Sequence, residues 1–313
     1  MKLNWLVVGV GDITTKRVLP AILAQPRGAL YGIVTRTPSK AAPYSCRVWT
    51  RLEEALEDPA IDAVYVATPV VMHAPQTIAS LRAGKHVLCE KPVAMNYDEA
   101  ARMAGVARET GRTLGIAYYR RMYPKVRRAR ALVAAGAVGR PVLAEINCHD
   151  WFTAANGFRS WLLEPEMAGG GPLYDIASHR IDLLNYFFGR PARVSGHLAN
   201  VVHASRVEDC ATVLIEYESG VRGVVDVRWH SRVARDEFRI VGTDGEIQLA
   251  PLSGPRLAYP GGEEHLPAHA NLHYPCVENF TGAVLDGEPL EASGESSIWT
   301  DWVTGQVTNP AAR

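Results

Sequence analysis

The sequence predicts an α/β protein of two domains, with a doubly wound parallel sheet in residues 1–120 and an antiparallel or mixed open sheet in residues 121–313. Three observations support this prediction. The chain has 313 residues, about twice the length of a common single domain. In the first part, short apolar runs alternate with amphipathic stretches, as in a parallel sheet covered by helices on both faces. In the second part, apolar runs follow one another with turn residues between them.

The first domain contains candidate strands at the apolar runs. They are Leu3–Val8, Leu30–Thr35, Ala63–Ala67, Val87–Cys89 and Thr113–Ala117. Thr50 and Glu53 form a capping-box pattern, which predicts the start of a helix between the second and third of these strands. Asn96 followed by acidic residues predicts the start of another helix, because carboxylates stabilise the positive end of a helix dipole.

The second domain begins with a predicted helix, Val126–Ala135, and a strand, Val142–Asn147. Its strongest helical pattern is Asp175–Phe188, which ends at Gly189. The later candidate strands are Ala211–Tyr217, Val221–Trp229, Glu237–Val241 and Glu246–Leu249, with turns at Ser219-Gly220 and Asp244-Gly245. A last helix is predicted at Val277–Leu285, ending before Gly287.

The composition excludes several classes of function. Hydrophobic residues make up 47% of the chain, and 33 basic residues balance 33 acidic ones, so no net charge attracts nucleic acid or an anionic membrane. No segment has the roughly 20 apolar residues of a membrane span, and no signal peptide is evident. The five cysteines are scattered without a CxxC spacing, which argues against a disulfide framework or structural zinc. We therefore expect a cytoplasmic protein.

The first strand leads into a glycine-rich turn, Gly9-Val10-Gly11-Asp12-Ile13-Thr14. Glycines at this place allow a sharp turn and a close approach to a pyrophosphate, which the amides of the next helix can bind. Thr14 stands where the dinucleotide fingerprint has Gly or Ala, and it predicts slightly wider packing of helix on strand. The alternative is a tight turn without a ligand.

The end of the second strand indicates which dinucleotide binds. An NAD site usually has Asp or Glu here, whereas this chain has Thr35-Arg36-Thr37-Pro38-Ser39-Lys40. Arg36 can stack on adenine and pair with a 2′-phosphate, and Thr35 and Lys40 are further donors. We therefore predict NADP, with NAD possible, against the alternative of a solvated basic turn.

Two further features carry reactive side chains. Glu90 and Lys91 follow an apolar strand at its carboxyl end, where open α/β sheets bind ligands, although a lysine at such a place is often a surface charge. Asp175, His179 and Asp182 share one stripe of a helix that follows three glycines. The alternatives for this stripe are a hydrogen-bonded core histidine and a metal site, but we predict no metal.

Together these features resemble the Gfo/Idh/MocA (glucose–fructose oxidoreductase/inositol dehydrogenase) family over nearly the whole chain. The matching segments are Ala67-Thr68-Pro69 with His73, Glu90-Lys91-Pro92, Tyr119-Arg120-Arg121 with Pro124, and the Asp175/His179/Asp182 helix after Gly169-Gly170-Gly171. The resemblance implies an N-terminal Rossmann domain and a C-terminal α/β domain with a large open, mostly antiparallel sheet. It also implies a homodimer or homotetramer formed through that sheet.

The resemblance further implies hydride transfer between NAD(P) and a carbinol or carbonyl carbon of a sugar, inositol or related polyol. Lys91 and His179 would be the catalytic pair, and Asp175 would help to hold the substrate. Further cofactor contacts would come from Thr68, Pro69, His73, Glu90 and Lys91. Substrate contacts would come from the region of Tyr119, Arg120, Arg121, Trp151, Arg159 and Trp161.

Some alternatives stay open on the sequence alone. The reaction can be oxidation or reduction, and either Lys91 or His179 can transfer the proton. A non-catalytic NADP-binding redox sensor and a metal-dependent sugar isomerase or hydrolase are the competing functions. Intact Lys91 and His179 favour the enzyme over the sensor.

Overall fold

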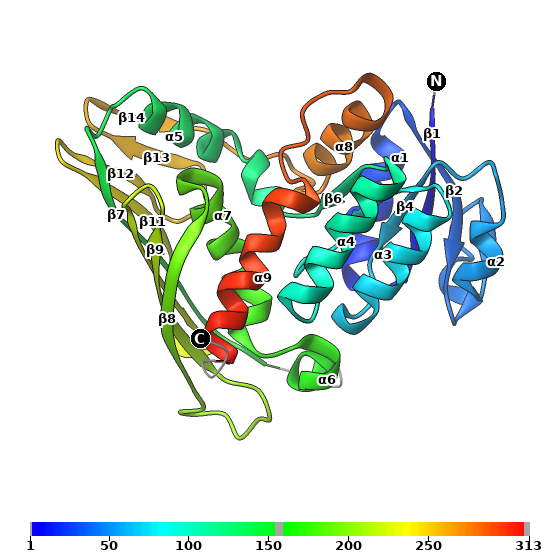
Figure 1. The fold of residues 1–313 in the computed structure, drawn as a ribbon, viewed down its shortest axis with the longest axis horizontal. Helices are drawn as coiled ribbons and strands as arrows, with labels where there is room; N and C mark the ends of the chain where they lie inside the picture. The colour runs from blue at the N-terminus through cyan, green and yellow to red at the C-terminus, as the bar shows by residue number, and fades with distance from the viewer. Residues whose placement is uncertain (1, 154–158, 310–313) are drawn as a thin grey trace. The chain divides into compact units, whose positions relative to one another are not determined.

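The computed structural model describes residues 2–153 and 159–309, which form two compact units (Figure 1). Unit 1 consists of Met1–Tyr119 and His269–Ile298, and unit 2 of Arg120–Ala268 and Trp299–Arg313. The chain therefore returns to unit 1 after passing through most of unit 2. The domain boundary at residue 120 remains a prediction.

Unit 1 is built on a parallel sheet. Its elements are β1 (Leu3–Val8), α1 (Leu19–Ala24), β2 (Gly28–Val34), β3 (Arg47–Trp49), α2 (Leu52–Leu56), β4 (Ala63–Val66), α3 (His73–Arg82), β5 (His86–Cys89), α4 (Tyr97–Thr110), β6 (Leu114–Ile116) and α8 (Tyr274–Asp286). The described strands form a sheet in the order β3-β2-β1-β4-β5-β6, in which every pairing is parallel. This order confirms the predicted doubly wound sheet, and its direction reverses between β1 and β4.

Helix α8 completes the core of unit 1 from the far end of the chain. The ring centroids of Phe280 and Trp5 are 5.3 Å apart, and both side chains are fully buried. A Cβ atom on Gly115 of β6 would lie 2.9 Å from the Phe280 ring, so only glycine lets α8 pack this closely.

Unit 2 contains a larger sheet. Its elements are α5 (Pro124–Ala134), β7 (Pro141–Trp151), α6 (Pro165–Ala168), α7 (Ser178–Phe188), β8 (Pro191–Ala199), β9 (Cys210–Tyr217), β10 (Arg222–Arg228), β11 (His230–Gly242), β12 (Glu246–Leu249), β13 (Arg256–Tyr259) and β14 (Gly262–His265). The described strands have the order β14-β13-β12-β11-β7-β10-β9-β8, and only the β7–β10 pairing among them is parallel. The predicted open, mostly antiparallel sheet is confirmed.

The apolar face of this sheet packs against α7. Phe187 meets Phe238 of β11 edge to face with 5.2 Å between centroids, and Phe188 lies 5.8 Å from Tyr217 of β9. Along β9, buried residues alternate with partly exposed ones, as expected for a sheet that buries one face.

One helix start differs in detail from the prediction, and one helix was missed. Helix α2 confirms the helix expected after Thr50, but the capping box does not form: Arg51 is the N-cap, no side chain caps the helix, and Glu53 lies 3.7 Å from the Arg51 guanidinium. Helix α9 (Gly294–Thr308) was not predicted, since its glycines and β-branched residues have low helix propensity and tertiary packing outweighs it. In contrast, the Asn96 cap is confirmed: its side chain accepts from the Glu99 amide at 3.0 Å.

Lys125 in α5 gives a prediction about stability. Its side chain is buried, its ammonium donates to the Pro251 carbonyl at 2.7 Å, and burial lowers its pKa from 10.5 to about 8. The folded state therefore releases this proton before the unfolded chain does, and folding gains stability as the pH rises from about 8 towards 10.5.

As the pH rises through that interval, we expect the free energy of unfolding of the wild type to increase relative to that of Lys125→Met, by on the order of 1 kcal/mol after solvent screening. Urea denaturation at pH 7, 8, 9 and 10 measures the difference. Lys16→Met, which removes an exposed lysine, should follow the wild-type pH profile. Parallel profiles for wild type and Lys125→Met would show that the amine titrates as in water.

Candidate functional site

The glycine turn lies directly after β1. Gly9 has φ +93°, and a Cβ atom there would lie 2.8 Å from the Ala67 carbonyl oxygen, so the position requires glycine. A Cβ atom on Gly11 would meet nothing within 4 Å. The protein itself therefore does not require glycine at position 11, and the open space beside it fits the close approach of a pyrophosphate.

Thr14 closes this turn. It is fully buried, and its hydroxyl donates to the Gly9 carbonyl at 3.0 Å. The helix begins with a π-helical turn, Thr14–Val18. Ile13 is half-buried, and Asp12 is exposed and pairs with Lys16 at 2.6 Å.

The basic turn after β2 contacts the glycine turn. The Lys40 ammonium lies 3.4 Å from the carbonyl oxygen of Val10, between the two glycines. Thr35 is buried and its hydroxyl accepts from the Thr37 amide at 3.2 Å, which shapes the turn. Arg36 is exposed. This places two cationic side chains at the carboxyl end of β1 and β2.

His73 joins two loops at the same edge of the sheet. Its Nδ1 lies 2.9 Å from the Pro92 carbonyl and its Nε2 lies 2.9 Å from the Thr68 carbonyl. Burial lowers the pKa of His73, whereas the two carbonyl oxygens favour the doubly protonated ring. Both ring nitrogens are thus engaged by the main chain, so His73 holds the Thr68-Pro69 loop against the loop after β5.

Glu90 is a buried carboxylate directly before Lys91. Its Oε1 accepts from the Tyr65 hydroxyl at 2.8 Å and lies 3.0 Å from Nε2 of His273, and its Oε2 accepts from the Lys91 amide at 3.3 Å. Burial alone would raise the pKa of Glu90, but His273, Tyr65 and Lys91 together hold it below its usual value. Lys91 itself is half-buried.

The Asp175/His179/Asp182 stripe belongs to unit 2, and its three side chains have different surroundings. Asp175 lies in a π-helical turn, Leu173–Ala177, and pairs with Arg159 at 2.6 Å. His179 is buried in the first turn of α7. Asp182 binds both arms of the Arg121 guanidinium, at 2.9 and 2.5 Å, with both side chains buried.

This pairing changes two expectations. Arg121 was predicted near substrate, but Asp182 engages its guanidinium in the interior. The alternative metal stripe would need Asp182 as a ligand, and Arg121 engages both of its carboxylate oxygens.

The three glycines before this helix are explained by packing. A Cβ atom on Gly169 or Gly170 would lie 2.6 or 2.5 Å from the Tyr174 ring, and one on Gly171 would lie 2.0 Å from the Glu208 carbonyl oxygen. The Glu208 carboxylate accepts from the amides of Gly171 and Leu173 at 2.9 and 3.0 Å. Glu208 thereby orients the helix start, a role that its sequence position did not indicate.

The remaining predicted substrate residues differ in exposure. Arg120 is buried and donates to the Ser253 hydroxyl at 3.3 Å. Trp161 is 37% exposed. Tyr119, in unit 1, is half-buried, with its ring 4.9 Å from that of His273.

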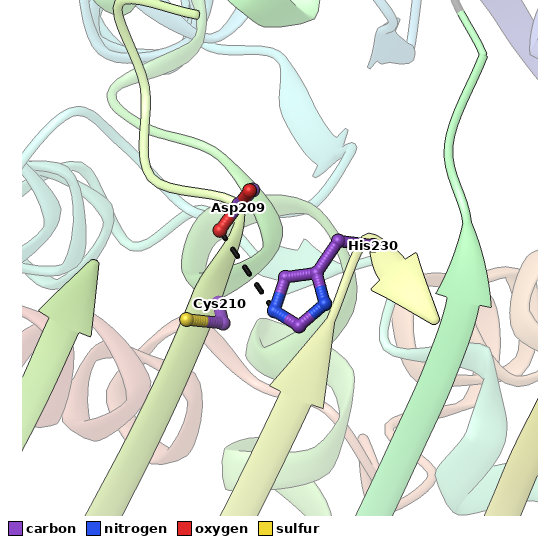
Figure 2. Close-up of side chains that lie close together, drawn as sticks. All are labelled: Asp209, Cys210 and His230. Atoms are coloured by element: carbon purple, nitrogen blue, oxygen red, sulfur yellow. Dashed lines mark ion pairs between the residues drawn. The ribbon is translucent and has the colours of Figure 1, made fainter. Parts of the chain in front are cut away.

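A second polar cluster lies elsewhere in unit 2. Figure 2 shows Asp209, Cys210 and His230 close together, with His230 Nε2 3.9 Å from an Asp209 carboxylate oxygen. Burial would raise the pKa of Asp209, but amides from residues 201–203 donate to its carboxylate at 2.8–2.9 Å and lower it. The carboxylate therefore has a structural role, which is to hold the loop between β8 and β9.

Two family models match the chain. An oxidoreductase family with an NAD-binding Rossmann fold matches residues 3–118, and the GFO/IDH/MocA C-terminal domain matches residues 126–248. A 1,5-anhydro-D-fructose reductase from Ensifer adhaerens is 31% identical over 95% of this chain and 92% of its own. A levoglucosan dehydrogenase from Pseudarthrobacter phenanthrenivorans is 30% identical over 61% of this chain and 56% of its own.

Solved structures share the fold. An aldose-aldose oxidoreductase from Caulobacter crescentus, complexed with glycerol, has a TM-score of 0.88 at 24% identity, covering 100% of this chain and 98% of its own. A levoglucosan dehydrogenase in complex with NADH has a TM-score of 0.90 at 22% identity, covering 100% and 97%. Within the described residues, no helix combines the length and apolar character that crossing a membrane requires.

The buried Arg121–Asp182 pair predicts a large loss of stability in Asp182→Asn. Removing the charge leaves the Arg121 guanidinium buried without its counter-charge, which costs on the order of 3 kcal/mol. The free energy of unfolding from urea denaturation measures this loss. Glu166→Gln, at an exposed ion pair with Arg206, should change it little. A variant as stable as wild type would contradict a buried ionic pair.

Proposed function

Because this chain belongs to the GFO/IDH/MocA family of NAD-binding oxidoreductases, we propose that it transfers hydride between NADP and a carbinol or carbonyl carbon of a sugar or related polyol. The family membership makes the chain a sugar-related, NAD(P)-dependent oxidoreductase. The choice of NADP over NAD and the identity of the substrate are our proposals.

One observation carries the assignment of the nucleotide site. The loops after β1, β4 and β5 contain Gly9–Gly11, Thr68 and Lys91, and these strands are neighbours in the sheet. Since carboxyl ends of parallel strands meet at one edge, the three loops converge beside the reversal of strand order, where such sheets bind dinucleotides. The open space at Gly11 supports a pyrophosphate there.

The turn after β2 supports NADP. Exposed Arg36 and Lys40 offer positive charge, and residues 35–40 contain no carboxylate that would repel a 2′-phosphate. Lys40 already contacts the main chain of the glycine turn, so its ammonium lies close to the expected phosphates.

The chemistry that we propose assigns roles to Lys91, His179 and Asp175. The nicotinamide supplies or accepts the hydride when it is bound. In oxidation, His179 takes the proton of the substrate hydroxyl while Lys91 donates to the same oxygen and stabilises the developing alkoxide. Reduction reverses these roles, and the assignment of the proton between Lys91 and His179 stays open. Asp175 binds a neighbouring hydroxyl group or orients His179.

The named relatives support a sugar as substrate, since they include an anhydrofructose reductase and a levoglucosan dehydrogenase. Arg159 and half-exposed Trp161 precede the Asp175 helix and offer a fork of donors and an aromatic face, which suit a polyol.

The predicted homodimer or homotetramer remains a proposal. Alternation along β9 leaves Leu214 half-exposed on the face of the sheet that faces away from α7. One exposed leucine is common on protein surfaces, so the proposed association rests on the family resemblance.

The proposed contact between Arg36 and the 2′-phosphate leads to a prediction about cofactor preference. We expect Arg36→Ala to weaken NADPH binding about tenfold or more, because a hydrogen-bonded charge pair with the 2′-phosphate is lost, and to leave NADH binding unchanged. Tryptophan fluorescence titration with each cofactor measures both affinities. Arg82→Ala, at an exposed residue in the last turn of α3, is the control. Tighter NADH than NADPH binding by the wild type would overturn the NADP proposal.

The proposed role of Lys91 leads to a prediction about turnover. Lys91→Ala should lower kcat for a sugar substrate about a hundredfold or more, because the developing alkoxide loses its donor, while NADPH still binds. Steady-state kinetics and fluorescence titration separate the two effects. Lys2→Ala, at an exposed lysine, should behave as wild type. Full turnover by Lys91→Ala would exclude the proposed role.

A further inference from the structure

A segment from late in the chain reaches the loop that carries Lys91. His273 immediately precedes α8 and is fully buried, and its Nε2 lies 3.0 Å from the Glu90 carboxylate, 183 residues earlier in the sequence. Tyr65 of β4 donates to the same oxygen, and the other Glu90 oxygen accepts from the Lys91 amide. Glu90 thus joins β4, the Lys91 loop and the start of α8.

The same segment also contacts the helix after the glycine turn. The Asn271 side-chain amide donates to the Arg17 carbonyl at 2.8 Å, and its oxygen accepts from the His273 amide at 3.0 Å. We call residues 269–274 the strap. It contacts the helix that follows the proposed phosphate-binding turn and the loop that carries Lys91.

The bonds of His273 indicate more than space filling. Because its Nε2 faces a carboxylate, this nitrogen carries the proton, and its buried Nδ1 has no hydrogen-bond partner among the described residues. Burying a ring nitrogen without a hydrogen bond costs free energy, and an apolar residue of similar size would not have this cost. The feature that histidine adds here is the hydrogen bond to Glu90.

The Glu90 carboxylate needs its donors for the same reason. A buried carboxylate is stable only when hydrogen bonds and opposite charge replace water, and here the Tyr65 hydroxyl, the His273 ring and the Lys91 amide do so. Without His273, Glu90 would take another rotamer or admit water. The Lys91 main chain would then lose its fixed acceptor.

We propose that His273 is a positioning residue for Lys91, acting through Glu90, and that the strap sets the geometry of the catalytic loop from the far end of the sequence. This inference rests on the proposed function, in which Lys91 stabilises the alkoxide. The strap affects kcat more than KM, because a displaced lysine still permits binding but aligns less well with the reacting oxygen.

The test compares His273→Gln, which keeps a donor at about the same distance, with His273→Leu, which keeps volume without a donor. We expect His273→Leu to lower kcat about tenfold to a hundredfold with KM little changed, and His273→Gln to restore most of it. Tyr65→Phe should also lower kcat, and its effect should be non-additive with that of His273→Leu, because both donors act on one carboxylate. Val277→Ala, one turn further along α8, controls for loss of packing.

Hydrogen exchange gives a readout without substrate. Pro92 has no amide proton, so a peptide covering 90–93 reports mainly the Lys91 and Val93 amides. We expect about tenfold faster exchange at this peptide in His273→Leu than in wild type or His273→Gln, from the weakened bond to Glu90. Equal exchange and equal kcat in His273→Leu and His273→Gln would overturn the positioning role.

Lys91→Ala, assayed in the same experiments, distinguishes failure of the proposed catalytic role of Lys91 from failure of the positioning role of His273. Full turnover by Lys91→Ala would refute the catalytic role of Lys91, whereas exchange at peptide 90–93 would still report whether His273 holds the loop. A large loss in Lys91→Ala with full kcat and slow exchange in His273→Leu would refute the strap alone.

Discussion

Beyond the ends of parallel strands, main-chain N–H and C=O groups have no hydrogen-bond partner in the sheet. In unit 1, buried side chains form hydrogen bonds with these groups, and the loops of the proposed nucleotide site depend on them. Thr14 donates to the Gly9 carbonyl, His73 lies against the carbonyls of Thr68 and Pro92, and Glu90 accepts from the Lys91 amide. Each of these side chains is buried, so each loop is fixed from within the unit and its outer surface stays available to a ligand.

Unit 2 uses carboxylates for the same purpose. Glu208 receives the amides at the start of the Asp175 turn, Asp182 receives the Arg121 guanidinium, and Asp209 receives the amides of residues 201–203. Glu208 is half-buried and the other two carboxylates are buried, and each accepts hydrogen bonds from at least two N–H groups, which is the condition under which a carboxylate is tolerated inside a protein. Several acidic residues that are conspicuous in the sequence therefore act as structural anchors.

The pattern of neighbouring residues in the sequence was sufficient to predict the Asn96 cap, the glycine turn and those strands of both sheets that are continuous apolar runs. It was insufficient where long-range contacts decide the structure. Asp182 looked like part of a reactive stripe because helical spacing is visible in sequence, whereas its partner Arg121 lies 61 residues away. The contacts of His273 and Glu208 are equally non-local. The π-helical turn at Leu173–Ala177 also departs from the regular period on which a stripe prediction depends.

The division of the chain between the units has a consequence for biosynthesis. Residues 269–298 belong to unit 1, and Phe280 covers Trp5 and Gly115. On the ribosome, the parallel sheet emerges long before the helix that covers this part of it, so its apolar surface stays exposed while unit 2 is translated. Folding of unit 1 therefore cannot finish until α8 has been translated, and the uncovered apolar surface is prone to aggregation until then.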